Sequence, residues 1–145
     1  MPSPVLAFDY GLRNIGVACS QPETGLASEL APLKARDGVP DWEQIARLLA
    51  QWQARQVVVG LPLNMDGSES ELSARARKFG KRLHGRFGVE VQMMDERLSS
   101  YAAKDEAGER GQRGNYSKQP IDSIAARLIL ESWLTQQQQQ NQQSP

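Results

Sequence analysis

The chain has 145 residues, and its 17 Lys and Arg residues are balanced by 17 Asp and Glu residues, so its formal net charge at pH 7 is zero. This length suits a single domain that buries a sizeable core. Zero net charge excludes a general attraction to polyanions, so any nucleic-acid site must be a local patch of positive charge. The single cysteine, Cys19, lies in an apolar run, where we expect a core residue rather than a nucleophile.

The sequence carries no recognisable targeting or membrane signal. Its N-terminus lacks a basic segment followed by a long apolar run, and no stretch approaches the ~20 apolar residues of a membrane span. A lone cysteine excludes an intrachain disulfide, which fits a reducing compartment. We therefore expect a cytoplasmic protein with no membrane partner.

Apolar runs near the N-terminus predict strands. The first strand ends at Asp9, and a turn then leads into the second, so the two strands form a β-hairpin with an acid at its mouth. Pro32 lies in a weaker third strand and places it at an edge or ends it early. In chain order, we expect strands over residues 5–8, 15–19 and 26–33, followed by a loop over residues 37–40.

The rest of the chain alternates helix and strand. Asp41 with Gln44 forms a capping-box-like pattern, and Ser68 with Glu71 forms another, so each pair marks the start of a helix. In chain order, we expect a helix over residues 42–52, a strand over 56–60, a helix after residue 68, a strand over 89–94, a short helix from 99 or 100 to 107, and a last helix over 121–134.

This order, βββ-α-β-α-β-α-α, predicts an α/β protein with a mixed sheet and helices on its faces. Residues 61–67 are an irregular turn because of Pro62 and the Asp66-Gly67 pair. Residues 108–119 are rich in Gly, Arg and polar side chains, which predicts a mobile loop. The Gln-rich residues 136–145 predict a disordered tail that follows a folded domain of residues 1–135.

Three acidic positions from distant segments lie at element ends: Asp9, Glu96 (beside Asp95) and Asp122. Brought together, three carboxylates would form a hard-cation site for phosphate chemistry, with Mg²⁺ or Mn²⁺ as the metal. Each acid also has a structural interpretation. Asp9 could support the hairpin turn, Asp95 and Glu96 could cap a helix or pair with Arg97, and Asp122 could favour a helix start through the helix dipole. Strand alternation alone leaves open whether Asp95 or Glu96 is the ligand.

Several segments resemble the YqgF/RuvX family, a group of pre-16S rRNA-processing nucleases and Holliday-junction resolvase relatives. They are Asp9-Tyr10-Gly11 with Ile15-Gly16-Val17-Ala18, the run GLPLNMDG at residues 60–67, Asp95-Glu96-Arg97-Leu98-Ser99, and Lys118 with Asp122. The resemblance covers residues 4–134. It implies a ribonuclease-H-like fold in which Asp9, Glu96 and Asp122 converge as catalytic metal ligands.

By the same resemblance, the expected activity is metal-dependent phosphodiester hydrolysis at the 5′ end of pre-16S rRNA during ribosome biogenesis. A Holliday junction resolvase in DNA recombination and repair is the second choice. A non-catalytic assembly factor that binds pre-ribosomal RNA is the third. The expected partners are structured nucleic acid, with pre-rRNA before branched DNA, and pre-ribosomal particles. The chain is expected to act as a monomer or a homodimer.

Basic side chains and one amide supply the candidate nucleic-acid contacts. We expect them to be Arg13, Asn64, Arg97, Arg110, Arg113 and Lys118. Asn64 is equally well explained as part of a structural turn. Arg75, Lys78, Arg82 and Arg86 recur at helical spacing and form a basic stripe, for which an ordinary solvated helix face is slightly favoured over phosphate contact.

Overall fold

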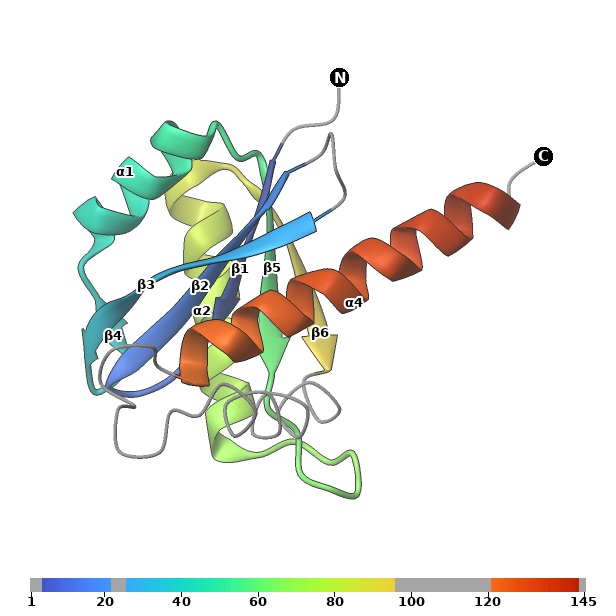
Figure 1. Cartoon of the computed structure of the whole chain (residues 1–145). Coiled ribbons are helices and arrows are strands. Elements are labelled where there is room, and N and C mark those ends of the chain that lie inside the picture. The colour runs from blue at the N-terminus through green and yellow to red at the C-terminus, as the bar shows by residue number, and fades with distance from the viewer. Residues whose placement is uncertain (1–3, 22–25, 96–120, 144–145) are drawn as a thin grey trace.

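The computed structural model describes residues 4–21, 26–95 and 121–143. Within them a six-stranded sheet has the strand order β4-β3-β2-β1-β5-β6, and three helices pack on it (Figure 1). The elements are β1 (Val5–Asp9), β2 (Asn14–Gln21), β3 (Leu26–Arg36), β4 (Val39–Pro40), α1 (Trp42–Trp52), β5 (Gln56–Leu61), α2 (Glu71–Phe87), β6 (Glu90–Asp95) and α4 (Ile121–Gln143).

The sheet is mixed, as the sequence predicts. β1 and β2 pair antiparallel in the expected hairpin, and β3 adds antiparallel to β2. β5 pairs parallel with β1, and β6 pairs parallel with β5. Consequently β1, β5 and β6 all end at the same edge of the sheet.

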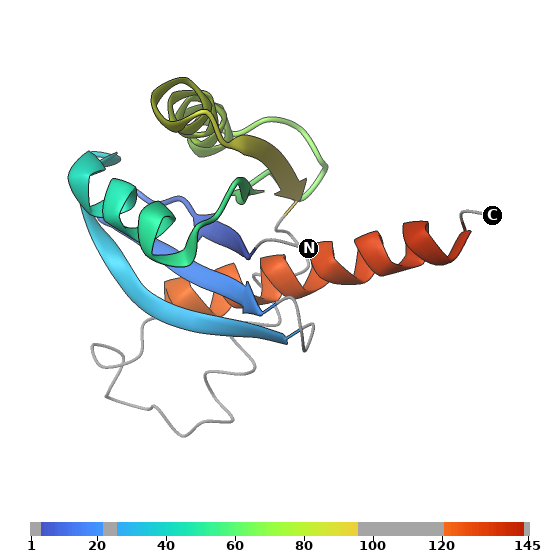
Figure 2. The ribbon, with the colours of Figure 1, turned by 90° about the horizontal axis from the view of Figure 1, so that it is seen from above.

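Helices cover both faces of the sheet. α1 and α2 pack on one face, and α4 crosses the other, as the view from above shows (Figure 2). The α1/α2 face buries Leu6, Phe8, Val57 and Val59, whereas the α4 face buries residues of opposite strand parity such as Val58. Alternation along each strand thus divides the core into two layers.

Cys19 is fully buried in the α1/α2 layer, which confirms the expectation of a core residue. Burial raises the pKa of its thiol and keeps it protonated. A buried, protonated thiol is a poor nucleophile.

The third strand is longer than expected, because Pro32 does not end it. The register between β2 and β3 shifts from Val17↔Leu30 to Ile15↔Leu33, so two residues of β3, including Pro32, lie opposite one residue of β2. A bulge of this kind tolerates a residue without an N–H.

Residues 37–40 are not simply a loop. Val39 and Pro40 form the short strand β4, which pairs with the end of β3. The two intervening residues, Asp37 and Gly38, have φ values of 47° and 82°. Positive φ at both positions is the pattern of a tight hairpin turn, for which Asp-Gly is a preferred sequence.

The last helix is longer than the helix expected over residues 121–134. α4 continues to Gln143, and its C-terminal part extends beyond the sheet (Figures 1 and 2). Glutamine is a good helix former, and no Gly or Pro interrupts residues 136–143, which favours continuation of the helix. The short helix expected near residues 99–107 and the loop expected at 108–119 lie outside the described residues. In the part of the chain that is described, no helix is long and apolar enough to cross a membrane.

Candidate active site and nucleic-acid interface

Two of the acids singled out from the sequence end parallel strands at one edge of the sheet. Asp9 is the last residue of β1, and Asp95 is the last residue of β6. The register links Phe8 with Val59 and Val59 with Met93, so these strand ends lie at nearly the same level. Carboxyl ends of parallel strands are where α/β sheets place their ligands.

Asp9 and Asp95 nevertheless lie on opposite faces. Val5 and Ala7 pack on the α4 side, so alternation along β1 puts the half-buried Asp9 on that same side. In β6, Met94 packs on the α4 side and Met93 on the α1/α2 side. The exposed Asp95 therefore follows the parity of Met93 and is directed away from the face that carries Asp9.

The third acid, Asp122, lies in the first turn of α4. The next residue, Ser123, is buried, and its Oγ donates a hydrogen bond of 2.8 Å to the carbonyl oxygen of Leu30. Leu30 pairs with Val17, which pairs with Phe8 near the end of β1. The start of α4 is thus docked on Asp9's face, close to the level of Asp9.

The described side chains do not by themselves complete a metal site. Within residues 4–21, 26–95 and 121–143, no group of three or more His, Cys, Asp and Glu side chains could hold a metal ion. Glu96 follows β6 directly and lies outside the described residues, as do Arg97, Arg110, Arg113 and Lys118. The convergence of Asp9, Glu96 and Asp122 therefore stays a prediction.

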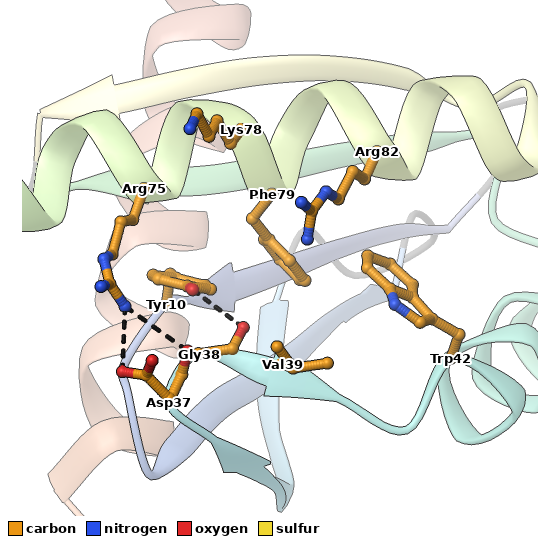
Figure 3. A pocket seen from close by; sticks show the side chains of 9 residues that line it. All are labelled: Tyr10, Asp37, Gly38, Val39, Trp42, Arg75, Lys78, Phe79 and Arg82. Atoms are coloured by element: carbon orange, nitrogen blue, oxygen red, sulfur yellow. Dashed lines mark hydrogen bonds and ion pairs between the residues drawn. The ribbon is translucent and has the colours of Figure 1, made fainter.

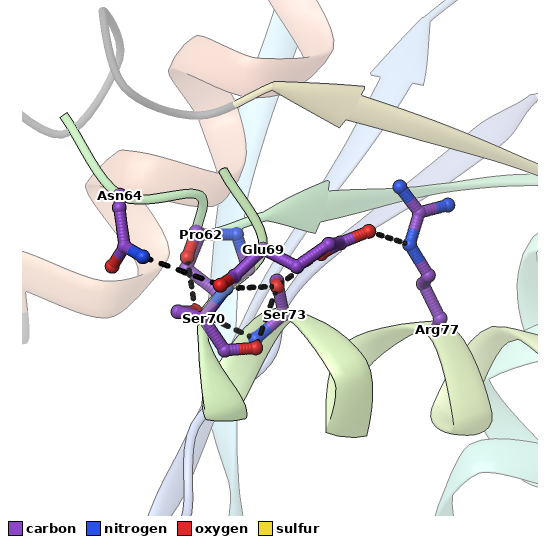
Figure 4. Close-up of polar contacts among 6 residues, drawn as sticks. All are labelled: Pro62, Asn64, Glu69, Ser70, Ser73 and Arg77. Carbon is purple, nitrogen blue, oxygen red and sulfur yellow. Dashed lines mark hydrogen bonds and ion pairs between the residues drawn. The ribbon is translucent and has the colours of Figure 1, made fainter. Parts of the chain in front are cut away.

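The segment after β5 is held by its own hydrogen bonds (Figure 4). The Asn64 amide donates to Ser68 Oγ at 3.0 Å and to the Glu69 carbonyl oxygen at 3.2 Å. Both bonds support the structural interpretation of Asn64, whose contact with nucleic acid stays a prediction.

The N-cap of α2 is Ser70 and not Ser68. Ser70 Oγ accepts a hydrogen bond of 2.9 Å from the Ser73 N–H, and Ser73 Oγ accepts one of 2.8 Å from the Ser70 N–H. Ser70 Oγ also donates to the Pro62 carbonyl oxygen at 2.7 Å. Ser68, the cap expected from the sequence, instead closes the preceding turn through Asp66 Oδ1.

Glu69 connects this cap to the body of α2. Its carboxylate accepts hydrogen bonds from Ser73 Oγ and from Arg77 Nε, the latter at 2.6 Å (Figure 4). The hydrogen bond from Ser73, followed by that from Arg77, lowers the pKa of Glu69 below its ordinary value of 4.5.

A basic pocket of about 250 Å³ opens between α2, the turn before β4 and the start of α1 (Figure 3). Its aromatic side is built on Phe79, whose ring centroid lies 5.1 Å from that of Tyr10 and 5.8 Å from that of Trp42. Tyr10 donates a hydrogen bond of 2.8 Å to the Gly38 carbonyl oxygen. Burial raises the pKa of Tyr10 against the opposing effect of Arg75 and Arg82, so the phenol stays protonated as a donor.

Three cations of the basic stripe line this pocket, namely Arg75, Lys78 and Arg82. Arg75 Nη1 lies 3.1 Å from Asp37 Oδ1, and the Arg82 guanidinium extends towards the aromatic side (Figure 3). Arg86 is different, because it stacks on Trp42 at 4.5 Å from the ring centroid. The interpretation as a simple solvated face therefore missed a pocket, since the opposing wall comes from residues far away in the sequence.

Arg13 is exposed just before β2 and lines a second hollow of about 530 Å³. Lys34 and Arg36 of β3 line the same hollow, and Val39 is shared with the first pocket. Local sequence gave no signal for Lys34 or Arg36, because only strand pairing brings them beside Arg13.

The sheet is mixed, its first strand ends in an acid, and helices cover both of its faces. These features define a ribonuclease-H-like α/β fold of the type found in RuvC-like resolvases. Residues 3–136 match the RuvX family, described as "Holliday junction resolvase". The chain belongs to this family.

Curated relatives cover nearly the whole chain. A Chromohalobacter salexigens protein is 62% identical over 129 residues, which is 89% of this chain and 87% of that protein. A Pseudomonas aeruginosa PAO1 protein is 56% identical over 132 residues, which is 91% of this chain and 92% of that protein. Both are named "Putative pre-16S rRNA nuclease".

Solved structures agree on the fold. Thermus thermophilus RuvC in complex with a Holliday junction gives a TM-score of 0.58 at 18% identity, with 94% of this chain and 96% of that chain covered. Fowlpox virus resolvase bound to Holliday junction DNA gives 0.56 at 15% identity, with 92% and 98% covered.

Proposed function

We propose that this chain is a metal-dependent endonuclease that hydrolyses phosphodiester bonds during processing of the 5′ end of pre-16S rRNA. The observation that carries the proposal is the 62% identity, over most of both chains, to a relative named "Putative pre-16S rRNA nuclease". Asp9 at the end of β1 supports the same chemistry, since a half-buried carboxylate there can face a ligand without full desolvation.

In this proposal Asp9, Glu96 and Asp122 are the catalytic carboxylates and hold Mg²⁺ or Mn²⁺. The donor set fits, because carboxylate oxygens are the ligands these hard cations prefer. When bound, such a metal activates water and stabilises charge on the phosphate. Asp95 is the poorer candidate, because the register directs it to the opposite face from Asp9.

The remaining predicted contacts have defined roles in the proposal. Arg13, Arg97, Arg110, Arg113 and Lys118 neutralise backbone phosphates, and Asn64 holds the loop after β5 beside the substrate. The partners are precursor rRNA and pre-ribosomal particles in the cytoplasm, and the chain acts as a monomer or a homodimer.

A Holliday junction resolvase is the second candidate function. The observation in its favour is the description of the family, together with a fold shared with resolvases solved on junction DNA. Sequence identity to those solved resolvases is 18% or lower, so they support the fold and leave the substrate open.

One experiment distinguishes the two candidate functions. Labelled RNA that spans the mature 5′ end of 16S rRNA and a labelled four-way DNA junction are incubated with the protein, with Mg²⁺ or with EDTA. The proposal expects Mg²⁺-dependent cleavage of the RNA and an intact junction. Cleavage of the junction alone would favour the resolvase, and binding of RNA without any cleavage would favour a non-catalytic assembly factor.

A further inference from the structure

Two basic hollows lie on either side of the β3–β4 turn. The first is the pocket lined by Arg75, Lys78 and Arg82, and the second is the hollow lined by Arg13, Lys34 and Arg36. Val39 of β4 lines both, so the hollows meet at this strand. We call the two joined hollows the basic track.

The basic track concentrates positive charge on a chain whose formal net charge is zero. Each hollow is lined by three cations and one carboxylate, so six cations face only two acids along the track. Both acids are engaged: Asp37 pairs with Arg75 at 3.1 Å, and Asp41 caps α1 by accepting a hydrogen bond from the Glu43 N–H at 3.0 Å. Among the described residues, Lys78 and Arg82 form no ion pair. The track therefore has cations available for an anionic ligand.

The pocket end of the track is held by packing and by its turn. Gly38 has a φ of 82°, and a Cβ atom there would lie 2.0 Å from the Tyr10 hydroxyl oxygen. Tyr10 is buried against Phe79, and the rings of Phe79 and Trp42 are stacked. Because the wall is fixed in this way, the pocket beside Arg75 and Arg82 is already formed before a ligand binds, and binding need not order it.

Strand register connects the other end of the track to Asp9. Asp9 pairs with Gly16, and Asn14 pairs with Lys34. Gly16 and Asn14 are two residues apart on β2, so Asp9 and Lys34 share one face of the sheet. The pocket, in contrast, lies on the α1/α2 face, which Tyr10 and Phe79 help to form. The track thus passes from the face of Asp9, round the β3–β4 turn, to the opposite face.

We infer that the basic track binds successive phosphates of an RNA strand and guides that strand from the face of Asp9 into the pocket beside α2. This inference extends the proposed function, because it assigns a substrate path beyond the acidic residues. A phosphodiester backbone fits better than a single small anion, since the cations are spread over two joined hollows and not gathered around one point.

The test is a salt titration of RNA binding. A short fluorescein-labelled single-stranded RNA is titrated with wild-type protein and with R75Q/K78Q/R82Q, in EDTA, over about 50 to 200 mM salt. If each side chain contacts one phosphate, the slope of log affinity against log salt should fall by about two units. Over this range the wild type should then lose about 20-fold more affinity than the variant.

The matched control is R47Q/R55Q/K81Q, which removes three exposed cations that line neither hollow. This control should keep the wild-type slope, and circular dichroism should show both variants folded. An unchanged slope in R75Q/K78Q/R82Q, or an equal fall of the slope in the control, would contradict RNA binding by the basic track. Cleavage is not read in this titration, so a protein that binds through the track but never cleaves RNA would refute only the proposed function.

Discussion

Asp9 and Asp95 end β1 and β6 at the same edge of the sheet, yet the strand register places them on opposite faces. The face of Asp9 is also the face that α4 covers, and Asp122 lies in the first turn of α4. An acid at the end of β6 that joins Asp9 must therefore lie an even number of residues from Met94, whose side chain is on the α4 face. In the sequence Glu96 meets this condition, and Asp95 does not.

The first prediction compares these two neighbours. Glu96→Gln should lower the rate of RNA cleavage about 100-fold or more. Removing even a residue that hydrogen-bonds to a metal ligand typically lowers metal affinity or activity about 10–100-fold. Asp95→Asn should leave the cleavage rate within about threefold of wild type. Single-turnover rates at saturating Mg²⁺ measure both, and the reverse ranking would assign the ligand to Asp95.

The second prediction concerns the start of α2. Ser70→Ala should lower the free energy of unfolding by about 1–2 kcal/mol, because it removes the N-cap and the bond to the Pro62 carbonyl oxygen. Ser68→Ala, at an exposed turn position, should cost no more than about 0.5 kcal/mol. Urea denaturation distinguishes the two, and a larger loss in Ser68→Ala would move the cap back to the position predicted from sequence.

The third prediction concerns how α4 docks on the sheet. Arg127, whose side chain is 15% exposed, lies 2.9 Å from Glu29 Oε2 on β3 and 3.1 Å from Glu131 Oε1 on its own helix. Arg127→Met leaves Glu29 without this partner and should cost about 1–3 kcal/mol of unfolding free energy. The exposed substitution Arg47→Met serves as the control in the same urea series. Equal stability of the two variants would mean that the ion pair does not anchor α4.

The fourth prediction is a pH dependence at Glu69. Hydrogen bonds from Ser73 and Arg77 lower its pKa in the folded state, so Glu69 stabilises the fold above the unfolded-state value near 4.5. That contribution is lost as the pH falls through the lower folded-state pKa. The difference in thermal midpoint between wild type and Glu69→Gln should therefore be constant near neutral pH and shrink below pH 4.5. A difference that stays constant down to pH 3 would contradict this role.

Much of the fold could be predicted from local sequence. Apolar runs ending at Asp9 and Gly60 predicted buried strands, and the structure has strands there. β4 was missed because it is only two residues long, although the Asp37-Gly38 pair before it is a strong hairpin signal. The helical end of α4 was missed because a low-complexity Gln run was interpreted from composition and not from helix propensity.

The site was harder to predict, because it depends on contacts between distant residues. The choice between Asp95 and Glu96 needs the pairing of β1, β5 and β6, which alternation within one strand does not supply. Predicting the pocket requires knowing that Asp37 and Arg75, which are 38 residues apart in the sequence, lie side by side. From helical spacing alone, a stripe that lines a pocket and a stripe that faces solvent look alike.

If Asp9 is a catalytic carboxylate of a metal-dependent ribonuclease, Asp9→Asn should abolish RNA cleavage in a protein that still folds. The amide keeps the size of the side chain but removes the charge that would hold the metal. Cleavage of RNA spanning the mature 5′ end of 16S rRNA is measured for wild type and Asp9→Asn at saturating Mg²⁺, with circular dichroism to verify folding. Wild type should cleave this RNA, and the variant should cleave it about 100-fold or more slowly. Near-normal cleavage by a folded Asp9→Asn protein would rule out a catalytic role for Asp9.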